Sequence, residues 1–123
     1  MEIKRLNDDF SVCKVERLTG IDFSGAFCFV GKTDDEISLV CMTRDVPTET
    51  LAREDGWRAF KIQGVLDFSM VGILAKIATV LAENQISIFA ISTFNTDYIL
   101  VKTKQAQKTA HVLVQAGYSL VCE

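Results

Sequence analysis

The chain has 123 residues, of which 49% are apolar and 24% charged, with a formal net charge of −3 and a pI near 5.1. This length suits one compact domain or two very small halves that share a core. The acidic balance argues against a nucleic-acid partner and an anionic membrane surface. No apolar stretch approaches the roughly 20 residues of a membrane span, and MEIKRLNDDF lacks a signal-peptide core, so cytoplasm is the expected location.

The cysteine and histidine pattern gives no sign of a metal or catalytic site. No two of the four cysteines form a Cys-x-x-Cys pair, and they lie in apolar, strand-like runs: Cys13, Cys28, Cys41 and Cys122. Zinc ligands usually come in close pairs and disulfide scaffolds are denser, so we expect reduced, buried thiols. His111 lies on a predicted helix without an acidic or cysteine neighbour, which favours a surface position. We therefore expect no catalytic residue, no metal and no cofactor.

In the first half of the chain, the sequence predicts two strands joined by an acidic turn. In AFCFVGKTDDEISLV (26–40), two β-prone runs flank TDDE (33–36), which we expect to be a solvated hairpin tip.

The next elements are a strand and a helix. WRAFKI (57–62) predicts a strand, and the apolar residues from Met70 to Asn84 recur at helical spacing. Ser69 suits the N-cap of this helix, and Asn84 suits a left-handed stop at its end.

The remaining elements complete a ferredoxin-like unit. ISIFAIST (86–93) and YILVK (98–102) predict a hairpin. An amphipathic helix follows from Ala106 to Val114 and is closed by Gly117, and YSLVC (118–122) predicts a last strand. The β-α-β-β-α-β order is that of the split βαβ, or ferredoxin-like, plan with strand order 4-1-3-2, so the fold class is α+β.

The two halves of the chain resemble one another. Shifted by 61 positions, residues 26–40 align with residues 87–101, and Glu36 then falls on Asp97. Upstream of residue 26 the best shift is 47. The two shifts, 61 and 47, differ by 14 residues, which is close to the length of the helix predicted from Met70 to Asn84. We therefore expect residues 1–56 to be a degenerate copy that lacks its first helix, and residues 57–123 to be the complete unit. The strand at Trp57 fits both copies, which suggests interlocked halves.

The predicted topology brings two polar segments to one edge of the sheet. In a 4-1-3-2 sheet the first two strands run in the same direction, so the loop GVLDFSMVG (64–72) and the tip STFNTD (92–97) meet. A helix N-terminus with unpaired N–H groups suits a carboxylate, and Asp97 suits an ammonium group, so a small zwitterion fits this edge. The same residues also suit simpler roles. Asp67 and Ser69 suit helix capping, Gly72 close packing, and Asn95 and Thr96 turn formation.

At these residues the chain resembles a known family. MVGILAKIATVLAENQISIFAIS followed by TFNTDYILVK is similar to the ACT domain, a small regulatory module that senses amino acids. GWRAFKIQGVLDFSMVGILA with STFNTDYIL resembles small tandem-ACT proteins related to aspartate kinase regulatory domains and to a cytosolic arginine sensor. The resemblance covers nearly all of residues 55–118 and, more weakly, residues 11–55. Many ACT domains carry Asp-x-x-Pro-Gly before the helix, whereas here Met70 and Val71 precede Gly72.

The resemblance implies a non-catalytic sensor that binds an amino acid and acts through self-association. ACT modules commonly bind their ligand where two modules meet, which implies a homodimer or a larger protein partner. The expected ligand-binding residues are Asp67, Ser69, Met70, Val71, Gly72, Ile73, Thr93, Phe94, Asn95, Thr96 and Asp97.

Three other classes of protein share this topology. An acylphosphatase-like enzyme needs an arginine in the anion-binding loop, and GVLDFSMVG has none. An RNA-binding module would place exposed aromatic residues in a basic surface, in contrast to this acidic chain. A ligand-free oligomerisation module is the main alternative, since apolar strands and sheet edges alone support that role.

Overall fold

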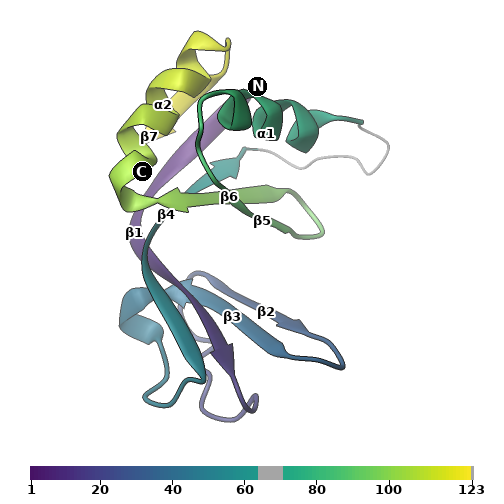
Figure 1. Ribbon diagram of the computed structural model, residues 1–123, viewed down its shortest axis with the longest axis vertical. Coiled ribbons are helices and arrows are strands. Elements are labelled where there is room, and N and C mark those ends of the chain that lie inside the picture. The colour runs from purple at the N-terminus through teal and green to yellow at the C-terminus, as the bar shows by residue number, and fades with distance from the viewer. Residues whose placement is uncertain (64–70, 123) are drawn as a thin grey trace. The chain divides into compact units, whose positions relative to one another are not determined.

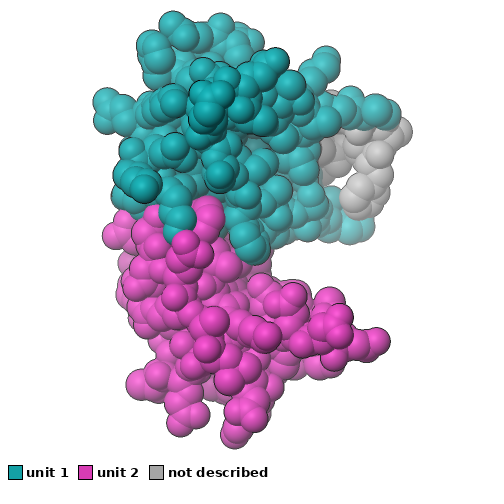
Figure 2. All heavy atoms as spheres, in the orientation of Figure 1, with its two compact units in different colours: residues 1–7, 58–123 teal, residues 8–57 magenta. Residues whose placement is uncertain are grey.

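The computed structural model describes residues 1–63 and 71–122 (Figure 1). The chain divides into two compact units, coloured separately in Figure 2. Unit 1 comprises residues 1–7 and 58–123, and unit 2 comprises residues 8–57. Residues 1–7 thus group with the C-terminal part of the chain, whereas the expected halves placed them with residues 8–56.

Unit 1 is an ACT-like βαββαβ arrangement with one additional strand. Two long strands, β1 (Glu2–Val15) and β4 (Ala52–Ile62), each contribute one end to it. The remaining elements are α1 (Ile73–Glu83), β5 (Phe89–Ser92), β6 (Asp97–Lys102), the 3-10 turn η2 (Thr103–Gln105), α2 (Ala106–Gln115) and β7 (Ser119–Cys122). The strand order in this unit is β7-β1-β4-β6-β5.

The position of β1 in unit 1 departs from the expected order. In a simple 4-1-3-2 sheet β7 would lie beside β4, but β1 lies between them and pairs with β7 in parallel, from Glu2–Ser119 to Arg5–Cys122. The segment EIKRL supports this pairing because Ile3, 1% exposed, belongs to the core of the unit. The N-terminal residues therefore form an internal strand of the sheet.

The core of unit 1 lies between its sheet and its two helices, which cover one face (Figure 1). From the strands come Ile3, Phe60, Ile62, Ile99 and Val101, and from the helices Ile77, Leu81, Ala106, Val112 and Leu113. The helical spacing seen in the sequence thus points the apolar faces of α1 and α2 at the sheet.

The ends of α1 differ from the prediction. The helix begins at Ile73, three residues later than expected, and Gly72 occupies the N-cap position in place of Ser69. Asn84 is the C-cap but has a φ of −107°, and Gln85 takes the left-handed conformation with a φ of 57°. The side chain of Asn84 donates to the carbonyl of Val80 (2.8 Å), which satisfies a carbonyl of the last helical turn.

Unit 2 has the 4-1-3-2 order without α-helices. Its strands follow the order β2-β3-β1-β4, with β2 (Cys28–Lys32) and β3 (Ile37–Met42) forming a hairpin. Residues 16–27 and 43–51 connect these strands, and their regular structure is one 3-10 turn, η1 (Thr43–Asp45). The first helix is therefore absent, as predicted, and the second is reduced to a short turn. Strand β4 is the fourth strand of this unit and the first strand of the βαββαβ arrangement of unit 1.

The hairpins of the two units match at a shift of 60 residues, one less than the predicted shift. Lys32 pairs with Ile37 at the end of one hairpin, as Ser92 pairs with Asp97 at the end of the other. The 3-10 turns η1 and η2 then start 60 residues apart, at Thr43 and Thr103. The predicted shift of 61 would exchange the two faces of each strand. Glu36 consequently corresponds to Thr96, not to Asp97.

Unit 2 combines a small apolar core with a polar network. Its core consists of Cys13, Val15, Leu39 and Cys41. Nearby, the hydroxyl of buried Ser11 donates to the Asp55 carboxylate (2.5 Å), which also accepts from Nε of Arg53 (2.8 Å). These two hydrogen bonds, that of Arg53 first, lower the pKa of Asp55.

Candidate functional site

The tip of the β5–β6 hairpin is fixed to the end of β4. Thr96 is 4% exposed, and its hydroxyl donates to the carbonyl of Ile62 (2.7 Å), the last residue of β4. This bond joins the two strand ends that the predicted topology brings to one edge. Figure 1 shows the hairpin tip and the beginning of α1 at the same end of unit 1.

A network within the turn shapes the tip. The backbone N–H of Thr93 donates to the carbonyl of Thr96 (2.8 Å), and the Thr93 hydroxyl donates to the same carbonyl (3.0 Å). The N–H of Thr96 donates in return to the Thr93 hydroxyl (3.3 Å). Thr33 and Glu36 make the equivalent backbone bond in unit 2 (2.9 Å). The two threonines of the tip are therefore turn residues as well as candidate ligand contacts.

Asp97 begins β6 and is partly buried. Its carboxylate accepts a hydrogen bond from the hydroxyl of Ser92 (2.5 Å), its partner across the hairpin. A carboxylate accepts several hydrogen bonds, so acceptor positions remain for an ammonium group. Ser92 was not among the predicted site residues, although the alternation of strand residues places it opposite Asp97.

The N-cap of α1 is a glycine in the left-handed conformation. Gly72 has a φ of 80° and no side chain that could cap the helix, and its carbonyl accepts the first helical bond, from the N–H of Lys76 (2.9 Å). The N–H groups of the first turn have no carbonyl partner within the helix, and they carry partial positive charge. A Cβ at Gly72 would meet no atom within 4 Å, so close packing does not explain this glycine.

The remaining predicted residues fall into three groups. Val71 and Phe94 are 91% and 79% exposed, and Asn95 is exposed as well. Ile73 packs against the core of unit 1. Asp67, Ser69 and Met70 lie outside the described residues.

The sheet next to the tip carries a cation–π pair. The Nζ of Lys61 lies 5.9 Å from the ring centroid of Tyr98, the residue after Asp97. Burial raises the pKa of the Tyr98 hydroxyl, so the phenol stays protonated near neutral pH. Lys61 therefore faces an uncharged aromatic ring and adds a positive charge near the end of β4.

The described residues contain neither a group of metal-binding side chains nor a helix that could span a membrane. Within residues 1–63 and 71–122, no three or more His, Cys, Asp or Glu side chains are grouped so that they could hold a metal ion. Neither α1 nor α2 has the length and apolar character required to cross a membrane, and these are the α-helices of the described part of the chain.

Comparisons with known proteins agree with this architecture. A crystal structure of a protein from Agrobacterium tumefaciens is 34% identical and superposes with a TM-score of 0.89, covering 99% of this chain and 92% of that one. No curated protein sequence matches the chain.

Aspartate kinases share the fold at lower identity. The aspartate kinase of Clostridium acetobutylicum is 16% identical, with a TM-score of 0.65 over 93% of this chain and 33% of the enzyme. The regulatory subunit of aspartate kinase from Thermus thermophilus is 12% identical, with a TM-score of 0.59 over 89% of this chain and 93% of that subunit. The ACT domain profile matches residues 52–115, more than half of the sequence. The chain therefore belongs to the ACT domain family.

Proposed function

We propose that this protein is a non-catalytic regulatory module that binds a free amino acid at the end of unit 1 where β4, the β5–β6 tip and the start of α1 meet. The hydrogen bond from Thr96 to Ile62 is the observation that carries the proposal, since it fixes the polar tip at the point where the chain leaves β4 toward α1. The fold shared with an aspartate kinase regulatory subunit supports a regulatory role.

The two ends of an amino acid match two features of this region. The α-carboxylate would bind the amides of the first turn of α1, at the positive end of the helix. The ammonium group would bind the carboxylate of Asp97, whose one hydrogen bond from Ser92 leaves other acceptor positions. Exposed Val71 and Phe94 would contact the side chain of the ligand. Asp67, Ser69 and Met70 complete the proposed set.

The proposed mode of action is self-association in the cytoplasm. Among the strands of the described residues, β2, β5 and β7 each pair with one other strand, so each leaves one edge unpaired. Unpaired strand edges are surfaces through which copies of a chain associate. We propose a homodimer, which the ligand would stabilise, and binding to a larger protein partner as a further route of regulation.

A thermal-shift screen with the twenty common amino acids tests the proposal. A ligand that binds only the folded protein must raise the melting temperature, so one or a few amino acids should raise it in a concentration-dependent manner. The matched control is the same amino acid with its carboxylate amidated, which should give no shift because the helix terminus then loses its anion. If no amino acid raises the melting temperature, the ligand-binding proposal is wrong. A dimer in sedimentation velocity would then favour the ligand-free oligomerisation module.

A further inference from the structure

The two segments that replace the helices of unit 2 line a solvent-open cavity of about 330 Å³. One wall follows β1 and consists of Val15, Glu16, Arg17, Thr19 and Gly20, and the other precedes β4 and consists of Pro47, Thr48, Glu49, Thr50 and Leu51. The N–H of Leu51 donates to the carbonyl of Lys14 (2.8 Å), which holds the two walls together. The volume is at the lower end of the range for small-molecule sites, about 300–1,000 Å³.

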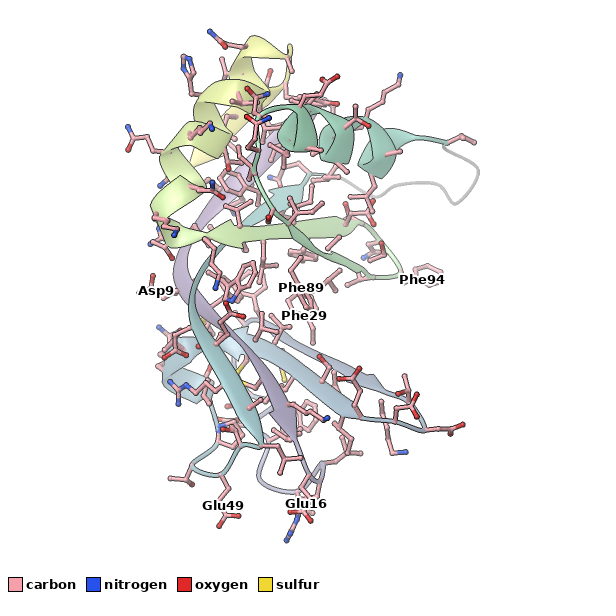
Figure 3. All side chains as sticks on the ribbon, in the orientation of Figure 1. Asp9, Glu16, Phe29, Glu49, Phe89 and Phe94 are labelled. Atoms are coloured by element: carbon pink, nitrogen blue, oxygen red, sulfur yellow. The ribbon has the colours of Figure 1, made fainter. Side chains whose placement is uncertain are left out.

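The charges of the lining favour a cation. Glu16 and Glu49 contribute one carboxylate from each wall, and Figure 3 shows both at this end of unit 2. The one cationic side chain of the lining, Arg17, forms an ion pair with Glu16 (3.5 Å). Within the described part of the chain, the Glu49 carboxylate has neither a hydrogen bond nor an ion pair. An incoming cation would therefore meet a carboxylate that is not already neutralised.

The rest of the lining suits a short aliphatic amine. Leu51, 60% exposed, and Pro47 provide apolar surface for a methylene chain. The hydroxyl oxygens of Thr19, Thr48 and Thr50 are acceptors for the N–H donors of an ammonium group. An anion would meet two carboxylates and a guanidinium that is already paired.

We propose that this cavity binds a small molecule that carries a primary ammonium group on a short methylene chain. The site lies in unit 2 and uses other residues than the amino-acid site proposed in unit 1, so neither depends on the other. Loss of the first helix, on this proposal, gave the degenerate copy a site of its own.

Titration of the isotope-labelled full chain with 1,4-diaminobutane, followed by amide NMR, locates the site. We expect saturable shifts concentrated in residues 15–20 and 47–51. 1-Butanol, which has a chain of similar length but no charge, should produce none. An absence of shifts at millimolar diamine, or shifts confined to unit 1, would overturn the proposal.

Reversing the charge of Glu49 distinguishes a specific contact with the diamine from general attraction between a cation and an acidic protein. Glu49→Lys should weaken diamine binding by about tenfold, because a favourable ion pair becomes a repulsive one. Glu36→Lys is the matched control, since Glu36 is exposed in the β2–β3 tip and does not line the cavity. Equal weakening by both substitutions would contradict the site. If circular dichroism shows that Glu49→Lys is unfolded, Glu49→Gln and Glu36→Gln replace the pair, with an expected difference of about threefold.

Discussion

At the scale of single residues, the β5–β6 tip contains polar side chains with different tasks. The Thr96 hydroxyl is buried and bonded to Ile62, so its removal would leave a carbonyl unsatisfied whether or not a ligand binds. Asp97 is bonded to one hydroxyl and keeps acceptor positions. Asp97 is therefore the residue whose substitution tests binding with the least damage to the fold.

Asp97→Asn should weaken binding of the amino acid selected by the screen by about tenfold, because the ammonium loses a charge-assisted hydrogen bond. The fold should persist, since the amide oxygen of asparagine accepts the same bond from Ser92. Calorimetric titration measures the affinity, and circular dichroism checks the fold. Asp34→Asn, the same change in the exposed β2–β3 tip, should leave the affinity unchanged. Equal affinities in wild type and Asp97→Asn would exclude the proposed role of Asp97.

At the scale of elements, the start of α1 depends on a backbone conformation that glycine adopts freely. Gly72→Ala should lower the free energy of unfolding by about 1 kcal/mol, because a residue with a Cβ is strained at a φ of 80°. Urea unfolding measures the change. Gly31→Ala in β2 serves as the control, since Gly31 lacks a positive φ and a Cβ there would meet no atom within 4 Å. A loss of stability no larger for Gly72 than for Gly31 would contradict this explanation.

The elements themselves follow largely from local patterns, whereas their pairing does not. The apolar spacing predicted both helices, and two apolar, β-prone runs around a polar centre predicted the β5–β6 hairpin. The inserted position of β1 could not be predicted, because pairing between Glu2 and Ser119 leaves no local signal. The shift between the copies was wrong by one residue, since apolar pairs such as Leu39-Val40 and Leu100-Val101 align equally well in two registers. The registers of the two hairpins show that Leu39 corresponds to Ile99.

The candidate site, like the fold, was predictable only in part. Its place at one edge of the sheet followed from the sequence, but the details of its contacts did not. Topology alone predicted that the hairpin tip would meet the end of β4, and the Thr96–Ile62 bond fits that prediction. The cap at Ser69 was wrong because a glycine can begin a helix through its backbone conformation, which composition does not reveal. The cavity of unit 2 gave no signal, because Glu16, Arg17 and Glu49 read as ordinary solvated loop residues.

At the scale of the whole molecule, the four cysteines are free and occupy different environments. Cys13 and Cys41 are buried, as predicted, but Cys28 is partly buried and Cys122 is exposed. Burial raises the pKa of Cys13 and Cys28, and it raises that of Cys41 to about 12. The buried thiols are therefore poor nucleophiles, since the thiolate is the reactive form.

Titration of the folded protein with a thiol reagent at mildly alkaline pH should show one fast thiol, one of intermediate rate, which is the partly buried Cys28, and two slow ones. The fast phase should belong to Cys122 and disappear in Cys122→Ser, while Cys13 and Cys41 should react only as the chain unfolds. All four thiols should be measured in denaturant without reductant. A count of two or fewer would mean that disulfides form and would contradict the expected reducing compartment.

The pairing of β1 with β7 also bears on the order in which the chain folds during synthesis. Residues 2–5 leave the ribosome well before their parallel partners, residues 119–122, which lie more than 100 residues further along the chain. Residues 8–57 form a contiguous unit that is complete before the rest of unit 1, from residue 58 onward, is made. Contacts between distant segments form slowly, and N-terminal units tend to fold first. We therefore expect unit 2 to fold before residues 2–5 of β1 can pair with β7.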